Sequence, residues 1–300
     1  SRAFKPSHIE SQRTLITERC AELVDEMGQH NSVDLVGALA APLPVTVIAH
    51  MLGVEDGNIQ TFKRWSDAIF SNIGDILFAE PNAEAVTAGE EMSAYFLEQI
   101  EILRQRPQNH LLGRLVETET DEGMLDNEEL LSFCRLLLIA GNETTTGLIT
   151  ASVRVFDEFP DTLPQLFEKP DLIPTFVEEA LRFYSPFSAT VRKTTSDVEI
   201  AGTVIQQGEL VIPLMASANR DERVFDRPGE FIIDRDPNPH LAFGFGIHFC
   251  LGAHLARLEG EIAVKALVDK FSAIQLEEED HSQMSALGGP DELMVKLTPR

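Results

Sequence analysis

Apolar residues recur at helical spacing through the first part of the chain. Phe62, Trp65 and Ile69, for example, stand three and four positions apart, which places their side chains on one face of an α-helix. The pattern predicts that residues 7–184 are mainly helical. Between residues 190 and 214 the apolar runs become short and are separated by glycines, as in a small sheet. The expected fold class is therefore α+β, with helix predominant.

Local signals predict where some of these elements begin and end. Asp126 stands three positions before Glu129, the spacing of a capping box, and predicts a long helix that runs to about residue 155. A shorter helix is predicted over residues 175–183, directly after a proline. Alternating apolar residues at 294–297 suggest a terminal hairpin.

The charge balance and the cysteines restrict the function and the compartment. Lysine and arginine total 24 against 49 acidic residues, a formal net charge of −25, which repels phosphate backbones and anionic membranes. No apolar run approaches the ~20 residues that a membrane span needs. The cysteines at 20, 134 and 250 are far apart and suggest no disulfide framework. We therefore expect one domain over residues 1–300, in the cytoplasm, that binds neither nucleic acid nor membrane.

A glycine-rich stretch around one cysteine carries the strongest chemical signal. Residues 243–252 read FGFGIHFCLG, after an irregular region and before a helix with an apolar stripe. Gly244 and Gly246 tolerate positive φ and let the backbone lie close to a flat ligand, and Phe243 offers an apolar wall. Cys250 stands where the helix begins, so its sulfur would face the positive end of the helix dipole, which favours the thiolate. The alternative is a buried cysteine beside a glycine-rich turn.

A second unusual stretch, AGNETT at residues 140–145, lies within the predicted long helix. Gly141 is about 1 kcal/mol less favourable than alanine in a helix, which suggests that a bulky cofactor approaches there. The hydroxyl of Thr144 can hydrogen-bond the carbonyl four residues earlier and widen the turn. Glu143 beside it completes an acid–alcohol pair suited to proton delivery. The alternative is a polar patch at a helix kink.

Together these two stretches resemble the cytochrome P-450 family. Residues 243–252 closely match its haem-binding loop, and residues 140–144 resemble its oxygen-activation motif. The resemblance implies the P-450 fold with small β-sheets, haem as the cofactor and Cys250 as the iron ligand. The residues that it places against the cofactor are Ala140, Gly141, Phe243 and Gly244, and those that it makes responsible for proton delivery are Glu143 and Thr144.

Haem carries two propionates, which need cations or hydrogen-bond donors. Arg192 and His240 match positions that hold the propionates in related proteins, and His248, two residues before the cysteine, is a further candidate.

A glutamate and an arginine three positions apart fit another family feature. Glu179 and Arg182 alone could be a surface ion pair worth ~0.2–0.5 kcal/mol, but the resemblance implies a buried pair that supports the irregular segment before the cysteine loop. Related sequences often carry an arginine before the phenylalanine that matches Phe231. Here that residue is Glu230, and Arg235 is the candidate substitute.

The resemblance implies a monooxygenase of the soluble bacterial type. It would insert one oxygen atom from O₂ into a small apolar substrate near Ile139 and Phe187, with electrons from a ferredoxin-type donor and its reductase. Residues 1–6 resemble the segment after the third major helix of bacterial members, so the N-terminal part of the fold is expected to be missing. The alternatives are a non-catalytic remnant with impaired haem binding and a peroxide-driven peroxygenase. The intact Glu143-Thr144 pair argues against the peroxygenase, because peroxygenases of this family usually lack it.

Overall fold

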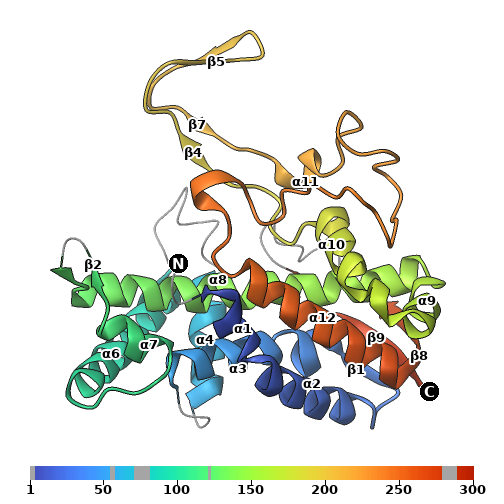
Figure 1. Ribbon diagram of the computed structural model, residues 1–300, viewed down its shortest axis with the longest axis horizontal. Helices are drawn as coiled ribbons and strands as arrows, with labels where there is room; N and C mark the ends of the chain where they lie inside the picture. Colours follow the sequence, from blue (N-terminus) through green and yellow to red (C-terminus); the bar gives the residue numbers. More distant parts are fainter. Residues whose placement is uncertain (1–3, 55–57, 71–81, 121–122, 279–288) are drawn as a thin grey trace.

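The computed structural model describes residues 4–54, 58–70, 82–120, 123–278 and 289–300. Helices account for more than half of these residues (Figure 1). In chain order they are α1 (Pro6–Glu10), α2 (Arg13–Met27), α3 (Pro42–Leu52), α4 (Ile59–Phe70), α6 (Ala83–Gln105), α7 (Leu111–Val116), α8 (Asn127–Glu158), α9 (Thr162–Glu168), α10 (Ile173–Tyr184), α11 (Met215–Ala218) and α12 (Ala253–Lys270). Shorter helical segments are η2 (Val36–Ala40), η4 (Pro170–Leu172) and η5 (Gly246–His248).

The strands form small antiparallel sheets. In the first sheet β9 (Met294–Pro299) lies between β1 (Ser32–Asp34) and β8 (Phe271–Glu278), which confirms the predicted terminal hairpin. The other sheets described here have two strands each. They pair β2 (Glu119–Thr120) with β3 (Gly123–Met124), β4 (Arg192–Lys193) with β7 (Leu210–Val211), and β5 (Val198–Ile200) with β6 (Thr203–Ile205). The predicted α+β class, predominantly helical, is confirmed.

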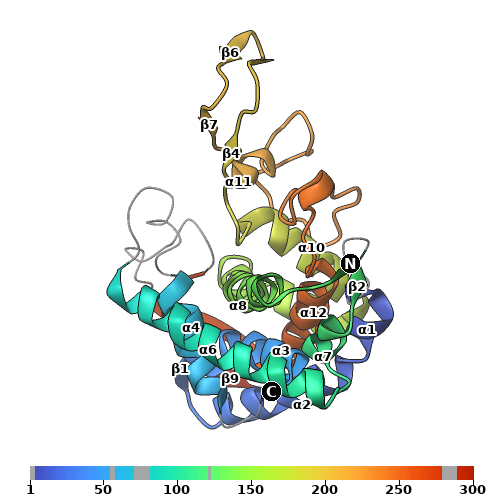
Figure 2. The same cartoon turned by 90° about the vertical axis from the view of Figure 1, so that its left-hand side faces the viewer.

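The central helix α8 begins as its capping box predicts. The Asp126 carboxylate accepts the N–H of Glu129 at 2.8 Å, and the Glu129 carboxylate accepts the N–H of Asp126 at 2.9 Å. The helix ends at Glu158, slightly beyond the predicted residue 155. It packs against α3, α4, α6, α10 and α12, and it occupies the middle of the molecule in Figure 2.

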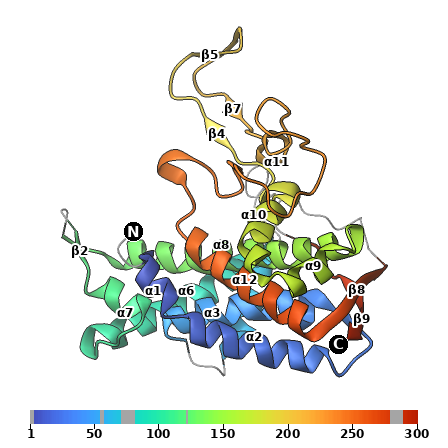
Figure 3. The ribbon, with the colours of Figure 1, turned by 45° about the vertical axis from the view of Figure 1, so that its right-hand side comes forward.

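Helices α2, α3, α6 and α7 lie on one side of α8, and the chain between α10 and α12 lies on the other (Figures 1 and 3). Strands β4 to β7 extend away from the helices on this second side. Most of the buried apolar side chains from α1 to β9 belong to one core cluster. None of the helices in the described ranges is long and apolar enough to cross a membrane.

The chain before the cysteine loop has little regular structure, as the sequence predicts. Helix α10 covers the predicted range 175–183 and extends it slightly at both ends. From residue 219 to residue 245 the described chain forms neither helix nor strand, and the short helix η5 precedes Cys250. This segment, residues 219–245, is called the meander below.

Candidate functional site

The cysteine loop has the backbone geometry that its glycines predict. Gly244 has φ of 72° and Gly246 has φ of 71°, values that only glycine adopts without strain. The N–H of Cys250 donates to the carbonyl of Phe243 at 2.9 Å, and the N–H of Gly244 donates to the carbonyl of Leu241 at 2.8 Å. The loop therefore closes on itself and presents Cys250 at its end, where the residue is exposed.

The sulfur of Cys250 lies at the start of α12, which begins at Ala253 after a short turn. Desolvation by the surrounding loop raises the pKa of the thiol, whereas the N–H groups of Gly252 and Ala253 and the charge of Arg257 lower it. The N–H groups of a helix start are thus directed at the sulfur, as the sequence predicts, although desolvation outweighs their effect on the free thiol.

Large apolar side chains surround this thiol without being covered by the described chain. Phe245 is 84% exposed, Ile247 is 97% exposed and Phe249 is 52% exposed. Contiguous exposed apolar side chains mark a binding surface. One thiolate donor within an apolar surface, on a backbone that lacks side chains at two positions, fits a flat apolar macrocycle whose metal accepts a sulfur ligand. The residues present therefore fit haem.

The α8 stretch of residues 140–145 supports part of the prediction. The Thr144 hydroxyl donates to the carbonyl of Ala140 at 2.7 Å, as expected. The helix nevertheless stays α-helical through this stretch, so the predicted widening of the turn is not observed. Ala140 is exposed, and Leu136, one turn earlier on the same face, is 55% exposed. This face is exposed, and the position of Ala140 beside a cofactor stays a prediction.

Gly141 lies close to a side chain of a neighbouring helix. A Cβ atom on Gly141 would lie 2.9 Å from Cδ1 of Ile48 in α3, too close for real side chains. The direction of this Cβ shows that the glycine faces α3, so helix–helix packing also favours a small residue here. The position of Gly141 beside the cofactor stays a prediction.

Glu143 lies in a partly buried environment beside other charges. Burial and the charge of Asp67 raise its pKa to about 7, although Lys63 opposes the shift. Its Oε1 atom accepts a hydrogen bond from the amide of Asn142 at 2.9 Å, and the same amide donates to Ser66 at 3.0 Å. A carboxyl group with a pKa near neutrality can both hold and release a proton, as proton delivery requires.

The predicted pair of Glu179 and Arg182 is buried. Arg182 donates to the two carboxylate oxygens of Glu179 from Nε and Nη2, each at 2.7 Å, and neither side chain has exposed surface. Arg235 donates to the same carboxylate from Nε at 3.0 Å. The N–H of Ile232 and the amide of Asn238 complete the set of donors. The candidate substitute Arg235 is confirmed as the third member.

Arg182 also holds the meander. Its guanidinium donates to the carbonyls of Asn219 at 2.9 Å, Pro228 at 3.0 Å and Glu230 at 3.0 Å. These carbonyls are distributed along the segment that leads to Cys250. The alternative of a surface ion pair is therefore excluded, and the predicted support of this segment is confirmed.

His240 has protein partners for both ring nitrogens. Nδ1 accepts the N–H of Ala242 at 3.2 Å, and Nε2 donates to a carboxylate oxygen of Glu178 at 3.1 Å. The side chain is only 3% exposed. Because neither nitrogen is available to a propionate in this geometry, the predicted role of His240 as a propionate partner is corrected to a structural one.

The other two candidates for the propionates are exposed. Arg192 begins β4, and its Nη1 atom donates to the Thr190 hydroxyl at 2.9 Å and to the Val191 carbonyl at 2.8 Å. His248 ends η5, next to the cysteine loop. Further donors of Arg192 and the ring of His248 can reach a ligand, so both stay candidates.

Three residues near this region were not identified from the sequence. Glu178 in α10 and Arg257 in α12 form a bidentate pair, and Glu259 in α12 is buried beside Thr145 of α8. Only Glu259 could have been found from the sequence, because it is an acidic residue within the apolar stripe of the helix predicted after Cys250. The partners of Glu178 and Arg257 come from distant segments, so no local spacing indicates them.

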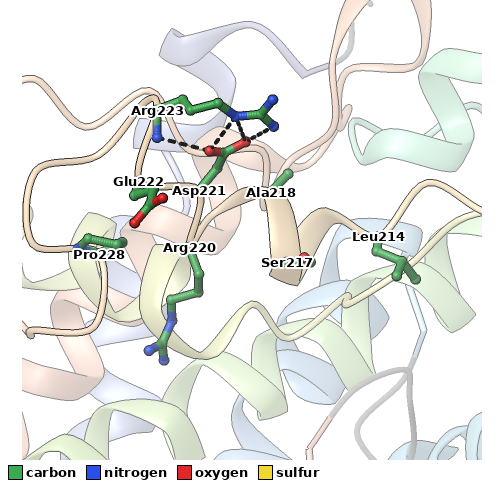
Figure 4. A pocket seen from close by; sticks show the side chains of 8 residues that line it. All are labelled: Leu214, Ser217, Ala218, Arg220, Asp221, Glu222, Arg223 and Pro228. Carbon is green, nitrogen blue, oxygen red and sulfur yellow. Dashed lines mark hydrogen bonds and ion pairs between the residues drawn. The ribbon is translucent and has the colours of Figure 1, made fainter. Parts of the chain in front are cut away.

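A surface pocket in the meander does not belong to this site (Figure 4). It is lined by Leu214, Ser217, Ala218, Arg220, Asp221, Glu222, Arg223 and Pro228, and Figure 4 shows Asp221 paired with Arg223 at its rim. None of the predicted site residues lines it. We assign this pocket no role.

The chain matches known proteins along nearly its whole length. A family model described as Cytochrome P450 matches residues 166–296. The chain is 41% identical to the putative cytochrome P450 YjiB of Bacillus subtilis, over 99% of this chain and 76% of the relative. It is 36% identical to the 6-deoxyerythronolide B hydroxylase of Saccharopolyspora erythraea, over 92% of this chain and 67% of the relative. Its structure is similar to that of the bacillaene polyketide synthase cytochrome P450 PksS of Bacillus subtilis 168, with a TM-score of 0.92 at 35% identity over 99% of this chain and 76% of that one. The chain belongs to the cytochrome P450 family.

Proposed function

We propose that this chain is a haem-thiolate monooxygenase in which Cys250 ligates the iron. Membership of the family makes the chain an oxidoreductase with haem as its cofactor. The observation that carries the assignment to Cys250 is its position at the end of a loop with two left-handed glycines, at a helix start, within an exposed apolar surface. The other two cysteines, Cys20 and Cys134, are buried.

The residues around Cys250 would stabilise its thiolate and help to bind the haem. Bound haem would supply the iron at which O₂ is activated by two electrons and two protons, with one oxygen atom inserted into substrate and the other released as water. The N–H groups of Gly252 and Ala253 favour the thiolate. Phe245 and Phe249 would cover the sulfur and keep water from it. Arg192 and His248 would bind the propionates.

Glu143 and Thr144, which are neighbours on α8, would deliver the protons that the reaction needs. The pKa of Glu143 near 7 allows the carboxyl group to exchange protons at neutral pH. The Thr144 hydroxyl, fixed by its bond to the Ala140 carbonyl, keeps its oxygen lone pairs free to accept a hydrogen bond on the open face of the helix. Ala140, small and exposed, would allow the cofactor to lie against this face.

The substrate, the electron donor and the compartment belong to the same proposal. We propose a small apolar substrate that contacts Ile139 and Phe187, and an external ferredoxin-type donor with its reductase. Cytoplasmic location is supported by the three cysteines, which are all free thiols. The peroxide-driven alternative is distinguished by comparing turnover with peroxide and turnover with a ferredoxin and reductase.

The proposed ligation is tested on the haem-loaded chain reduced under carbon monoxide. We expect the absorption band of a thiolate-ligated complex in the wild type and in Cys134→Ala, which makes the same change at a buried cysteine outside the loop. Cys250→Ala should lose this band while far-UV circular dichroism stays unchanged. An unchanged band in Cys250→Ala, or no such band in the wild type, would exclude Cys250 as the ligand.

A further inference from the structure

Three side chains from distant parts of the sequence meet beside the cysteine loop. Glu178 lies in α10, His240 lies in the meander and Arg257 lies in α12. Arg257 donates from Nε to one carboxylate oxygen of Glu178 at 2.6 Å and from Nη2 to the other at 2.9 Å. His240 donates to the same carboxylate at 3.1 Å. These three residues, called the Glu178 cluster below, connect both helices to the meander through charge-assisted hydrogen bonds.

The cluster contacts the loop that carries the sulfur. The guanidinium of Arg257 lies over the ring of Phe243, 4.5 Å from its centroid, in a cation–π arrangement. The centroids of the His240 and Phe243 rings lie 6.0 Å apart. The carbonyl of Phe243 accepts the N–H of Cys250. A continuous series of contacts therefore leads from Glu178 through Arg257 and Phe243 to Cys250.

The cluster also places opposite charges next to the loop that carries the sulfur. Partial burial raises the pKa of Glu178, but hydrogen bonds from His240 and Arg257 outweigh this and lower it to about 2, so the group is a carboxylate at neutral pH. Because the side chains of Glu178 and Arg257 are only 30% and 29% exposed, water screens their fields incompletely.

We propose that Glu178 is a positioning residue for the Cys250 thiolate: it orients Arg257 against Phe243 and balances the positive charge that the sulfur experiences. With Glu178 present, the positive charge of Arg257 is paired with a carboxylate beside the loop of Cys250. Without it, the guanidinium charge stabilises the added electron of the reduced centre, and the reduction potential rises. The inference rests on the proposed ligation of iron by Cys250.

The test is a cycle of variants measured by anaerobic redox titration of the haem-loaded protein. Glu178→Gln should shift the reduction potential upward, and Arg257→Met should shift it downward. In the Arg257→Met background, Glu178→Gln should shift the potential upward by less than in the wild-type background, because the part of its effect that passes through Arg257 is gone. Glu168→Gln, the same change at an exposed position in α9, is the control. Arg257→Lys keeps the charge but loses the bidentate geometry. It should hold the potential closer to wild type than Arg257→Met does, which a purely structural role would not predict.

Two results would overturn the proposal. One is a potential in Glu178→Gln that equals that of the Glu168→Gln control. The other is an upward shift of equal size with and without Arg257. If Glu178→Gln takes up no haem, adding Arg257→Met should restore uptake by removing the unbalanced charge, and uptake that stays lost also rejects the proposal. The thiolate band of the wild type is recorded first, so that its absence is attributed to the proposed function and not to this inference.

Discussion

Replacing Glu259 with glutamine tests whether α12 carries a protonated carboxyl group at neutral pH. The residue is 1% exposed, and its Oε1 atom has no hydrogen-bond partner in the described part of the chain. Burial raises its pKa from the ordinary value of 4.5 to about 8, and a hydrogen bond from Thr145 offsets this only in part. A buried carboxyl group without a cation nearby stays neutral because ionisation in a low-dielectric interior is unfavourable.

The sign of the pH dependence follows from this shift. Between pH 4.5 and about pH 8 the folded chain keeps the proton of Glu259 and the unfolded chain releases it. The folded state therefore binds more protons, and its stability relative to the unfolded state falls as pH rises through this window. The contribution is complete below the unfolded pKa and is lost above about pH 8. Each pH unit is worth about 1.4 kcal/mol, so the free energy of unfolding should lose roughly 2–3 kcal/mol between about pH 6 and about pH 8 from this group.

The assay compares urea unfolding by far-UV circular dichroism at these two pH values. Glu259→Gln keeps the shape of the side chain and removes its ionisation, so this part of the pH dependence should disappear. Glu168→Gln, an exposed carboxyl group in α9, should behave like the wild type. All three proteins are compared in the same haem-loading state, so that other titrating groups contribute equally. Parallel pH dependence in the wild type and in Glu259→Gln would refute the reasoning.

Three further changes test the rest of the site. Arg182→Ala should lower the free energy of unfolding by ~3–5 kcal/mol, because it leaves the buried Glu179 carboxylate without its main cation. Urea unfolding measures this loss, and a value below about 1 kcal/mol would contradict the prediction. Gly141→Ala should gain about 1 kcal/mol of helix propensity and lose about 1–3 kcal/mol by overpacking against Ile48. Adding Ile48→Val should recover part of the overpacking loss. Glu143→Gln should reduce the product formed per O₂ consumed and abolish the decline of this ratio above about pH 7. An unaltered pH profile of the ratio would remove Glu143 from proton delivery.

The elements that the sequence predicts well are those determined by neighbouring residues. The start of α8 follows from Asp126 and Glu129, whose reciprocal hydrogen bonds span three positions. The conformation of the loop before Cys250 could be predicted from Gly244 and Gly246, because glycine adopts positive φ without strain whatever its neighbours are. In both cases the interaction that stabilises the conformation lies within one turn of the chain.

Contacts between distant segments could not be predicted from the sequence. No local pattern around Gly141 indicates that Ile48, almost a hundred positions earlier, lies beside it. His240 was interpreted as a propionate partner, but the approach of α10 places Glu178 against its ring. Periodicity indicates which face of a helix is apolar, and it does not indicate which partner will cover that face. Tertiary packing therefore decides the role of such residues.

The meander shows why the chemistry of this site depends on buried charge far from the sulfur. A segment without helix or strand leaves its carbonyls without regular partners, and buried carbonyls must be satisfied in another way. Arg235 donates to the carbonyls of Asp226 and Arg227 and shares that of Glu230 with Arg182. One buried carboxylate, Glu179, holds both guanidinium groups in place. The conformation of the chain that leads to the thiol is thus set by a few permanent charges, so a substitution among them should alter iron ligation without touching the cofactor.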